Sequence, residues 1–409
     1  MDFDDTREEA EFRKEVRLWL EANAAHFNKP PAKALSDAEA LEVARAWQVK
    51  RAESGYAKIT WPKEYGGLGG TPIQAVIYEQ EESRYYIPNG FFHIGLGMCM
   101  PTMIAYATKE QLKRYVPKAL SGEEIWCQLF SEPVAGSDLA GIRTRAEKDG
   151  DEWVINGQKV WTSGAHYADY AILITRSDPT KPKHKGLTMF FIDMHAPGVE
   201  VRPIKQINGG AKFNEVFFTD LRIPDSQRLG EVSDGWRVAL TTLMNERMTV
   251  SGDTLVGPKY RQFLELAKLV QLEDGPAIED PQIRERLADW YIKRQGLRLT
   301  RYRTLTKLSK GEAPGPEASL TKVTLAPLLQ EEAAYAMELM GQAGIVMDAD
   351  IAPLNAAYQE SALVAPGYRI AGGTDEILRN IIAERVLGLP GDVRVDKTAP
   401  FNELPSGNV

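Results

Sequence analysis

The sequence predicts an α+β multidomain fold with an N-terminal α-helical domain, a central β-barrel-like domain and a C-terminal four-helix bundle. The spacing of apolar residues changes from helical to strand-like near residue 125 and back to helical near residue 230. A chain of 409 residues, 43% of them hydrophobic, can also bury more than one core. We therefore place the domains at 1–124, 125–230 and 231–392, with a tail over 393–409.

Each domain has its own pattern. Helical spacing covers 5–25, 36–54, 73–84 and 101–120, and short β-branched or aromatic runs such as YAILITR and LTMFFIDM follow up to residue 228. Ser233 and Asp234 are good helix caps, and helical patterns persist from there to Gly388. LEDGPAIEDPQ and GEAPGP interrupt them as loops of a bundle. The tail has no periodicity and is expected to be a surface tail or an arm onto a neighbouring subunit.

Composition excludes several classes of function. The net charge is -8 with scattered basic residues, which argues against nucleic acid as a partner. The two cysteines and five histidines show no metal-ligand spacing, so no metal site is predicted. No run approaches the roughly 20 apolar residues that cross a bilayer, and the acidic N-terminus lacks a signal core. We expect a cytoplasmic protein without a membrane partner.

Residues 126–164 are the strongest candidate for a binding site. WCQLFSEPVAGSD begins as a half-buried strand and turns into an irregular loop, where Ser131 and Ser137 offer donors to a flavin carbonyl or a thioester oxygen. In WVINGQKVWTSGA, Asn156-Gly157 predicts a hairpin turn, and Trp161 then places a flat indole beside hydroxyl groups. This suits an isoalloxazine ring, although a buried hairpin with a core tryptophan fits the same residue types.

Three segments resemble signatures of the acyl-CoA dehydrogenase family: SEPVAGSD, NGQKVWTSGA, and GGTDEILRNIIAERVLGLP at 372–390. The resemblance covers nearly the whole chain. It implies an FAD-dependent α,β-desaturation of an acyl-CoA thioester, in a dimer or tetramer that passes electrons to electron-transfer flavoprotein. It also implies FAD contacts in the middle domain and in the C-terminal domain, namely Gln128, Phe130, Ser131, Trp161, Thr162 and Ser163, then Glu338, Gly341, Gln342, Thr374 and Glu376.

Desaturation needs a base on the face of the acyl chain opposite the flavin. The family places this glutamate at one of two points, and at the first, before the glycine-threonine pair of the last motif, this chain has Gly372. The second point is a glutamate followed by arginine on the first helix after the β domain, and Glu246-Arg247 matches it. The resemblance thus implies Glu246 as the base, with Ser137, Arg247, Gly372 and Gly373 near the substrate. A surface ion pair is the alternative role for Glu246.

The remaining alternatives concern substrate and assembly. The missing side chain at Gly372 leaves room for a bulky acyl group, branched or ring-bearing like a steroid or terpenoid. The structural alternative is that Gly372 and Gly373 permit an unusual backbone path. The arginine that usually reaches FAD across the subunit interface is absent from LAKLVQLEDGPAIED, and Glu338 stands where glutamine is usual. A heteromeric assembly in which this chain is mainly structural therefore stays open, as does a flavin oxidase or monooxygenase on the same fold.

Overall fold

The computed structural model describes most of the chain, namely residues 5–29, 35–250, 260–310, 315–316, 319–391, 393 and 396–404, with the side chains of 246–250, 305, 308 and 309 outside the description. The chain divides into two compact units. The larger unit is built on Glu11–Lys29 and Leu35–Thr249 together with the tail from Asp392, and the smaller mainly on Val250–Gly391.

The four predicted helical segments before the sheet correspond to five α-helices in the described residues: α1 Arg7–Ala24, α2 Asp37–Glu53, α3 Pro72–Glu82, α4 Met100–Tyr106 and α5 Lys109–Ser121. Ser36, Thr71 and Thr108 each form a capping box that starts a helix. The Thr108 cap explains why the predicted helix over 101–120 is divided in two.

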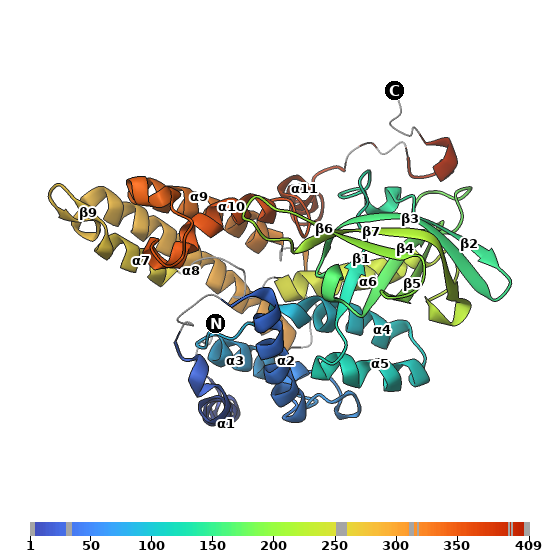
Figure 1. Ribbon diagram of the computed structural model, residues 1–409, viewed down its shortest axis with the longest axis horizontal. Helices are drawn as coiled ribbons and strands as arrows, with labels where there is room; N and C mark the ends of the chain where they lie inside the picture. Colours follow the sequence, from blue (N-terminus) through green and yellow to red (C-terminus); the bar gives the residue numbers. More distant parts are fainter. Residues whose placement is uncertain are drawn as a thin grey trace. The chain divides into compact units, whose positions relative to one another are not determined.

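The sheet has eight strands in the described residues: β1 Trp126–Leu129, β2 Arg145–Asp149, β3 Glu152–Ser163, β4 Tyr170–Arg176, β5 Leu187–Asp193, β6 Val199–Ile204, β7 Phe213–Pro224 and β8 Arg228–Leu229. Their order is β6-β7-β3-β2-β4-β5-β8, and β1 pairs with β4 in parallel (Figure 1). The predicted β domain is therefore confirmed, but its path ends at β6 and β8 instead of closing into a barrel.

The predicted hairpin turn at Asn156-Gly157 is wrong. The turn lies at Gly150 between β2 and β3, and Gly157 sits inside β3 beside a register shift in its pairing with β7. A Cβ atom at Gly157 would lie 2.5 Å from Thr144 Oγ1. The glycine is thus needed because β3 passes close to Thr144, not because the chain reverses there.

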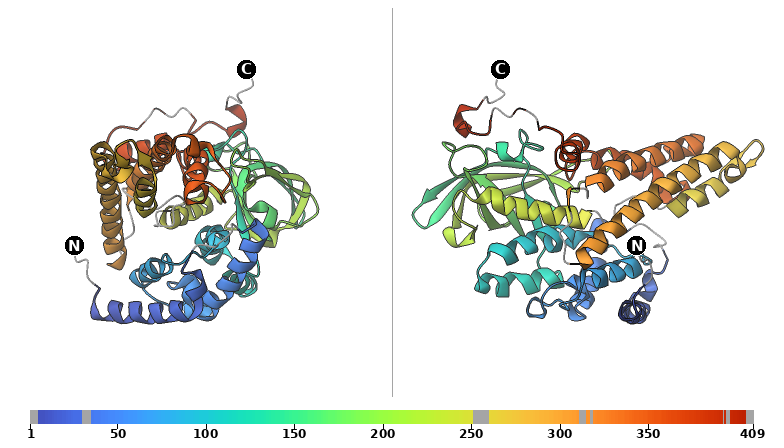
Figure 2. Two further views of the ribbon diagram at one scale, coloured as in Figure 1. Left: turned by 60° about the vertical axis from the view of Figure 1, so that its left-hand side comes forward. Right: turned by 180° about the vertical axis from the view of Figure 1, so that it is seen from behind.

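Two cores lie on opposite faces of the sheet because neighbouring residues of a strand point to opposite sides. Phe190 belongs to the core around Trp153, whereas Phe191 belongs to the core that the helices cover. That second core joins α4 and α5 to α6 (Gly235–Val250), and Figure 2 shows these helices stacked against one face of the green sheet.

The smaller unit is a helical bundle made of α7 Tyr260–Leu269, α8 Pro281–Ser309, α9 Ser319–Leu339, α10 Ala357–Tyr368 and α11 Asp375–Arg385. Trp290 and Phe263 form its centre, and Arg294 Nε donates to Glu332 Oε1 at 2.8 Å between the adjacent helices α8 and α9. The predicted loop at 272–282 holds a small hairpin, β9 (Gln271–Leu272) with β10 (Gly275–Pro276). Within the described residues, no helix is long and apolar enough to span a membrane.

Candidate active site

A buried ion pair joins the two central sequence motifs. The Glu132 carboxylate, just after β1, accepts hydrogen bonds from the backbone N–H of Arg143 at 2.6 Å and of Thr144 at 2.9 Å. Lys159 Nζ, on β3, lies 2.9 Å from the same carboxylate and also donates to the Phe130 carbonyl at 3.0 Å. Since the Lys159 side chain is fully buried, this pair holds the end of β1 against β3.

Each charge of this pair favours the charged form of the other. Burial alone would raise the pKa of Glu132, but Lys159 and the hydrogen bonds hold that pKa below its usual value. Burial lowers the pKa of Lys159, and the nearby carboxylate offsets only part of that effect. The Glu132 carboxylate thus stays charged near neutral pH, and its contacts with Lys159 make the pair a fixed structural anchor beside the candidate site.

Trp161 stands out from β3 in an uncommon backbone conformation. It has a φ of 61°, and it lies where the pairing of β3 with β7 shifts register between Lys159 and Thr162. Trp161 is 60% exposed, and its indole forms a T-shaped pair with the ring of Phe213, with the ring centroids 6.2 Å apart. A bulky residue at positive φ is strained, so this bulge places a large aromatic face outside the core at a cost in backbone energy.

Thr162, the next residue, is buried but incompletely bonded. Asn214 Nδ2 donates to its carbonyl at 2.9 Å, whereas the Thr162 hydroxyl and the Asn214 Oδ1 have no hydrogen-bond partner in the described part of the chain. A buried polar atom without a partner costs about 1–3 kcal/mol. An exposed aromatic face beside such a hydroxyl fits a flat cofactor with a polar rim, such as a flavin.

The structure brings the two motifs together at this place. Val160 N donates to the Ser131 carbonyl at 2.9 Å, so the loop after β1 runs beside the site-bearing half of β3. Gln128, Ser131 and Ser163 are partly exposed there and Ser137 is exposed, as ligand contacts require. Phe130 is buried in the core, and its carbonyl rather than its ring takes part in this arrangement.

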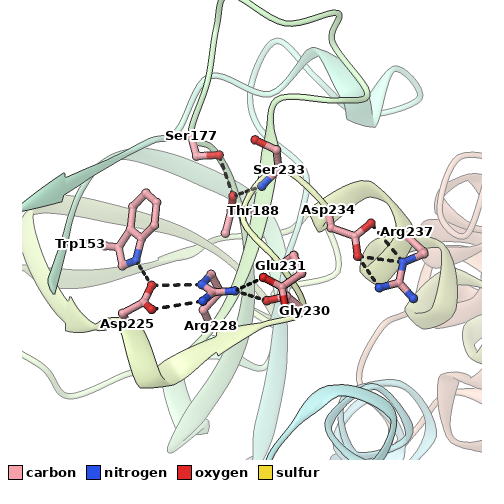
Figure 3. A network of polar contacts seen from close by, with 10 residues as sticks. All are labelled: Trp153, Ser177, Thr188, Asp225, Arg228, Gly230, Glu231, Ser233, Asp234 and Arg237. Carbon is pink, nitrogen blue, oxygen red and sulfur yellow. Dashed lines mark hydrogen bonds and ion pairs between the residues drawn. The ribbon is translucent and has the colours of Figure 1, made fainter. Parts of the chain in front are cut away.

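Helix α6 begins in close contact with the sheet (Figure 3). Ser233 N donates to Thr188 Oγ1 at 3.0 Å, and that hydroxyl also bonds to Ser177 Oγ at 2.6 Å. A Cβ atom on Gly235 would lie 2.7 Å from the backbone of Leu187 and Thr188. Only glycine allows this approach, so the position of the first turn of α6 is defined by strand β5.

A second set of contacts in Figure 3 supports the same end of α6. Trp153 Nε1 donates to Asp225 at 2.7 Å, and Arg228 Nε donates to the same carboxylate at 3.0 Å. The hydrogen bonds from Arg228, followed by that from Trp153, lower the pKa of Asp225 to about 2. Arg228 also binds the Gly230 carbonyl, and Asp234 pairs with Arg237 in the first turn of the helix.

Further along α6, a buried hydrogen bond fixes the rotation of the helix. Thr242 Oγ1 lies 2.8 Å from Thr102 Oγ1 of α4, and both residues are fully buried. Ala239 is buried on the same face, so these residues pack against helices instead of lining open space. The backbone of Glu246 follows one turn after Thr242, while the side chains of Glu246 and Arg247 lie outside the described residues.

The remaining predicted residues belong to the smaller unit. Gly372 and Gly373 have φ values of 64° and 93°, so the backbone here does take the path that favours glycine. Lys322 donates to the Gly373 carbonyl, and Thr374 caps α11 by accepting from Ile377 N at 3.2 Å. Glu376 is exposed in the first turn of α11, and Glu338, Gly341 and Gln342 are exposed where α9 ends. These residues and those on β3 lie in different units.

Sequence reasoning missed Glu132, Lys159 and Asn214. The first two stand inside the SEPVAGSD and NGQKVWTSGA motifs, but a pairing across 27 residues leaves no mark in local spacing. Asn214 lies on β7, outside the motifs that the sequence analysis singles out. Among the described residues, no group of three or more histidine, cysteine or acidic side chains is arranged to hold a metal ion.

Known proteins resemble this chain over nearly its whole length. Three family models match, the acyl-CoA dehydrogenase N-terminal domain at 6–123, middle domain at 127–221 and C-terminal domain at 233–387. The acyl-CoA dehydrogenase IpdE1 of Mycobacterium tuberculosis is 39% identical, with 94% of this chain and 98% of that protein covered. IpdE1 of Mycolicibacterium smegmatis is also 39% identical, with the same coverage.

Two solved structures extend the likeness to the fold. A structure titled Tcur3481-Tcur3483 steroid ACAD has a TM-score of 0.81 and 29% identity, covering 96% of this chain and 100% of that one. The ChsE4-ChsE5 complex from Mycobacterium tuberculosis has a TM-score of 0.78 and 28% identity, with 96% and 100% covered.

Proposed function

Since this chain belongs to the acyl-CoA dehydrogenase family of flavin-dependent oxidoreductases, we propose that it binds FAD and desaturates the α,β bond of an acyl-CoA thioester. The observation that carries this proposal is the exposed indole of Trp161, held at positive φ next to Thr162, whose hydroxyl has no hydrogen-bond partner among the described residues. Bound FAD supplies the hydride acceptor for the β-carbon.

The residues of the larger unit then hold the cofactor and the thioester. Trp161 stacks on the ring, while Thr162 and Ser163 supply hydrogen bonds to its polar rim. Gln128, Ser131 and the backbone of Phe130 contact the flavin ring near the end of β1, and Ser137 contacts the substrate. Further proposed FAD contacts belong to the smaller unit, namely Glu338, Gly341, Gln342, Thr374 and Glu376, and the positive end of the α11 dipole suits a diphosphate.

Glu246 is the proposed base, which takes the proton from the α-carbon of the substrate, with Arg247, Gly372 and Gly373 close to the acyl group. The support is its place on α6, whose start is anchored on β5 and whose rotation is set by the Thr102–Thr242 bond. Such anchoring keeps a base in line with its target. No carboxylate stands at Gly372, the other point where the family carries this group.

The variant Glu246→Gln tests this role. We expect it to keep the fold and the flavin but to lose bleaching of the flavin by substrate under anaerobic conditions. The matched control is Glu231→Gln, because the Glu231 side chain is 87% exposed nearby, before the start of α6. An unchanged bleaching rate in Glu246→Gln would remove Glu246 from the reaction.

The proposed substrate is a thioester with a bulky, ring-bearing acyl group, and the proposed electron acceptor is electron-transfer flavoprotein. The support is the glycine at position 372 and the likeness to a structure titled as a steroid ACAD. The first experiment is the visible spectrum of the purified protein, followed by anaerobic addition of straight-chain and ring-bearing thioesters. A yellow protein bleached mainly by ring-bearing thioesters is expected, and a clear preference for straight chains would contradict the substrate proposal.

A heteromeric assembly is the second candidate, alongside a homodimer or homotetramer. It is favoured by the likeness to a complex of two different chains, ChsE4 and ChsE5. A colourless protein that gains flavin only when a second chain is co-expressed would support it, and a yellow homo-oligomer with full turnover would reject it. Rapid reoxidation of the reduced protein in air would instead favour an oxidase.

A further inference from the structure

The C-terminal tail, residues 396–404, is bound to the sheet unit through its backbone. Phe401 N donates to the Lys181 carbonyl and Asn402 N to the Pro179 carbonyl, both at 3.0 Å, and Pro400 forms a β-bridge with Pro182. Its partner is the docking loop, residues 178–186, which joins β4 to β5. The tail that was expected to be a surface segment or an arm onto another subunit thus packs on the sheet unit of its own chain.

Lys183 of the docking loop connects the tail to the loop that follows β1. Its ammonium group donates to both carboxylate oxygens of Asp138, at 2.9 and 3.0 Å, and also pairs with Asp396 of the tail. The Lys183 side chain is only 9% exposed. Because burial disfavours the lone charge, Asp396 helps to keep this ammonium in place between the two segments.

Arg176, at the end of β4, makes the second connection. Its guanidinium group donates to the carbonyls of Ala140 and Ile142 in the loop after β1, and to the Lys183 carbonyl at 2.7 Å. The ring of Phe401 covers this group, with the guanidinium carbon 3.8 Å from the ring centroid. A cation stacked at this distance is held by the aromatic face and shielded from water.

We infer that Asp396 and Phe401 are positioning residues: through Lys183 and Arg176, the tail holds the loop 131–142 in the conformation that meets the substrate. The two cations contact this loop at three residues. Lys183 pairs with Asp138, and Arg176 donates to the carbonyls of Ala140 and Ile142. The effect on catalysis rests on the proposed function, in which Ser137 of the same loop contacts the thioester. The effect on the order of the loop does not rest on the proposed function.

The test uses the full chain with its cofactor and two disruptive variants, Asp396→Ala and Phe401→Leu. Asp396→Glu and Phe401→Tyr retain the charge and the aromatic face, and should therefore restore wild-type behaviour. Glu403→Gln is the matched control, because Glu403 is exposed on the same tail. Hydrogen exchange of peptides that cover 132–142 is measured first, with peptides from β5 as the reference.

We expect amides of 132–142 to exchange about tenfold faster in the two disruptive variants, with β5 and the flavin spectrum unchanged. The KM for the thioester should rise about three- to tenfold while kcat stays within about twofold, because the loop binds substrate without taking part in proton transfer. Unchanged exchange in both variants would overturn the inference, as would equal effects in Glu403→Gln. Faster exchange in the two disruptive variants, combined with a wild-type protein that turns over no acyl-CoA thioester, would uphold the tail's role and reject the proposed function.

Discussion

Replacing Lys159 with methionine leaves the Glu132 carboxylate buried without its cation. Breaking a buried pair by removing one partner costs about 3–5 kcal/mol. Glu132 keeps its hydrogen bonds from Arg143 N and Thr144 N, so the lower end, about 3 kcal/mol, applies. For a unit of this size, that corresponds to a fall in Tm of about 6–12 °C.

The loss should depend on pH in a defined direction. In the wild type the pKa of Glu132 is lowered, so its stabilisation is complete above the unfolded value of 4.5 and is lost only as the pH falls further. Without Lys159, burial raises the pKa of Glu132, and the variant gains stability as the pH falls towards 4.5 because the buried carboxyl takes up a proton. The deficit should therefore be larger at about pH 7.5 than at about pH 5.

Thermal unfolding followed by circular dichroism at these two pH values checks the reasoning. Lys205→Met is the control, because Lys205 is an exposed lysine of the same unit and its loss should leave Tm within about 1 °C. Equal deficits of Lys159→Met at both pH values, or no deficit at all, would refute the argument.

Three further predictions follow from single contacts. Trp161→Ala should weaken FAD binding at least about tenfold but change Tm little, since Trp161 is 60% exposed. Trp161→Phe should retain an aromatic surface for the flavin and bind it more tightly than Trp161→Ala. If a flavin fluorescence titration gave the same Kd for FAD in wild type and Trp161→Ala, Trp161 would not belong to the site. Asp225→Asn should lower the free energy of unfolding by about 1 kcal/mol at neutral pH. In thermal melts, the difference in stability between wild type and variant should disappear as the pH falls from about 4 to about 2, because the wild-type carboxyl then takes up a proton. A difference that stays constant with pH would mean that the Asp225 charge does not cause it. Gly235→Ala should lower the free energy of unfolding by about 2 kcal/mol or more in scanning calorimetry, since the new Cβ would meet the backbone of β5. The control Gly296→Ala should raise it by up to about 1 kcal/mol, because a Cβ there has no described atom within 4 Å. An unchanged stability of Gly235→Ala would mean that α6 can shift at no cost.

The sequence predicted those parts of the fold that depend on local periodicity. Helices over the N-terminal third and strands such as Tyr170–Arg176 follow directly from apolar spacing, because one buried face imposes one period. The Asn156-Gly157 turn failed for the opposite reason. A glycine required by a neighbouring segment looks the same in sequence as a glycine required by its own turn.

The sequence predicted which motifs form the candidate site, but not the backbone conformation that places their side chains. Trp161 was chosen for its aromatic ring, whereas its positive φ depends on a register shift against β7, which no local pattern records. The tail illustrates the same limit. Its lack of periodicity predicted a surface segment or an arm, yet Phe401 is fixed by Arg176, a residue more than 200 positions earlier in the chain.

Strand β3 is divided along its length. Residues 152–155 are paired on both sides, with β2 and with β7. From Gly157 on, the ladder partners among the described strands come from β7 alone, and the register shift leaves Val160 and Trp161 outside that ladder. The residues that are paired on both sides and those proposed to meet the flavin therefore occupy separate stretches of one strand. Substitutions confined to 161–163 would therefore change the proposed flavin contacts without disturbing the half of the strand that is paired on both sides.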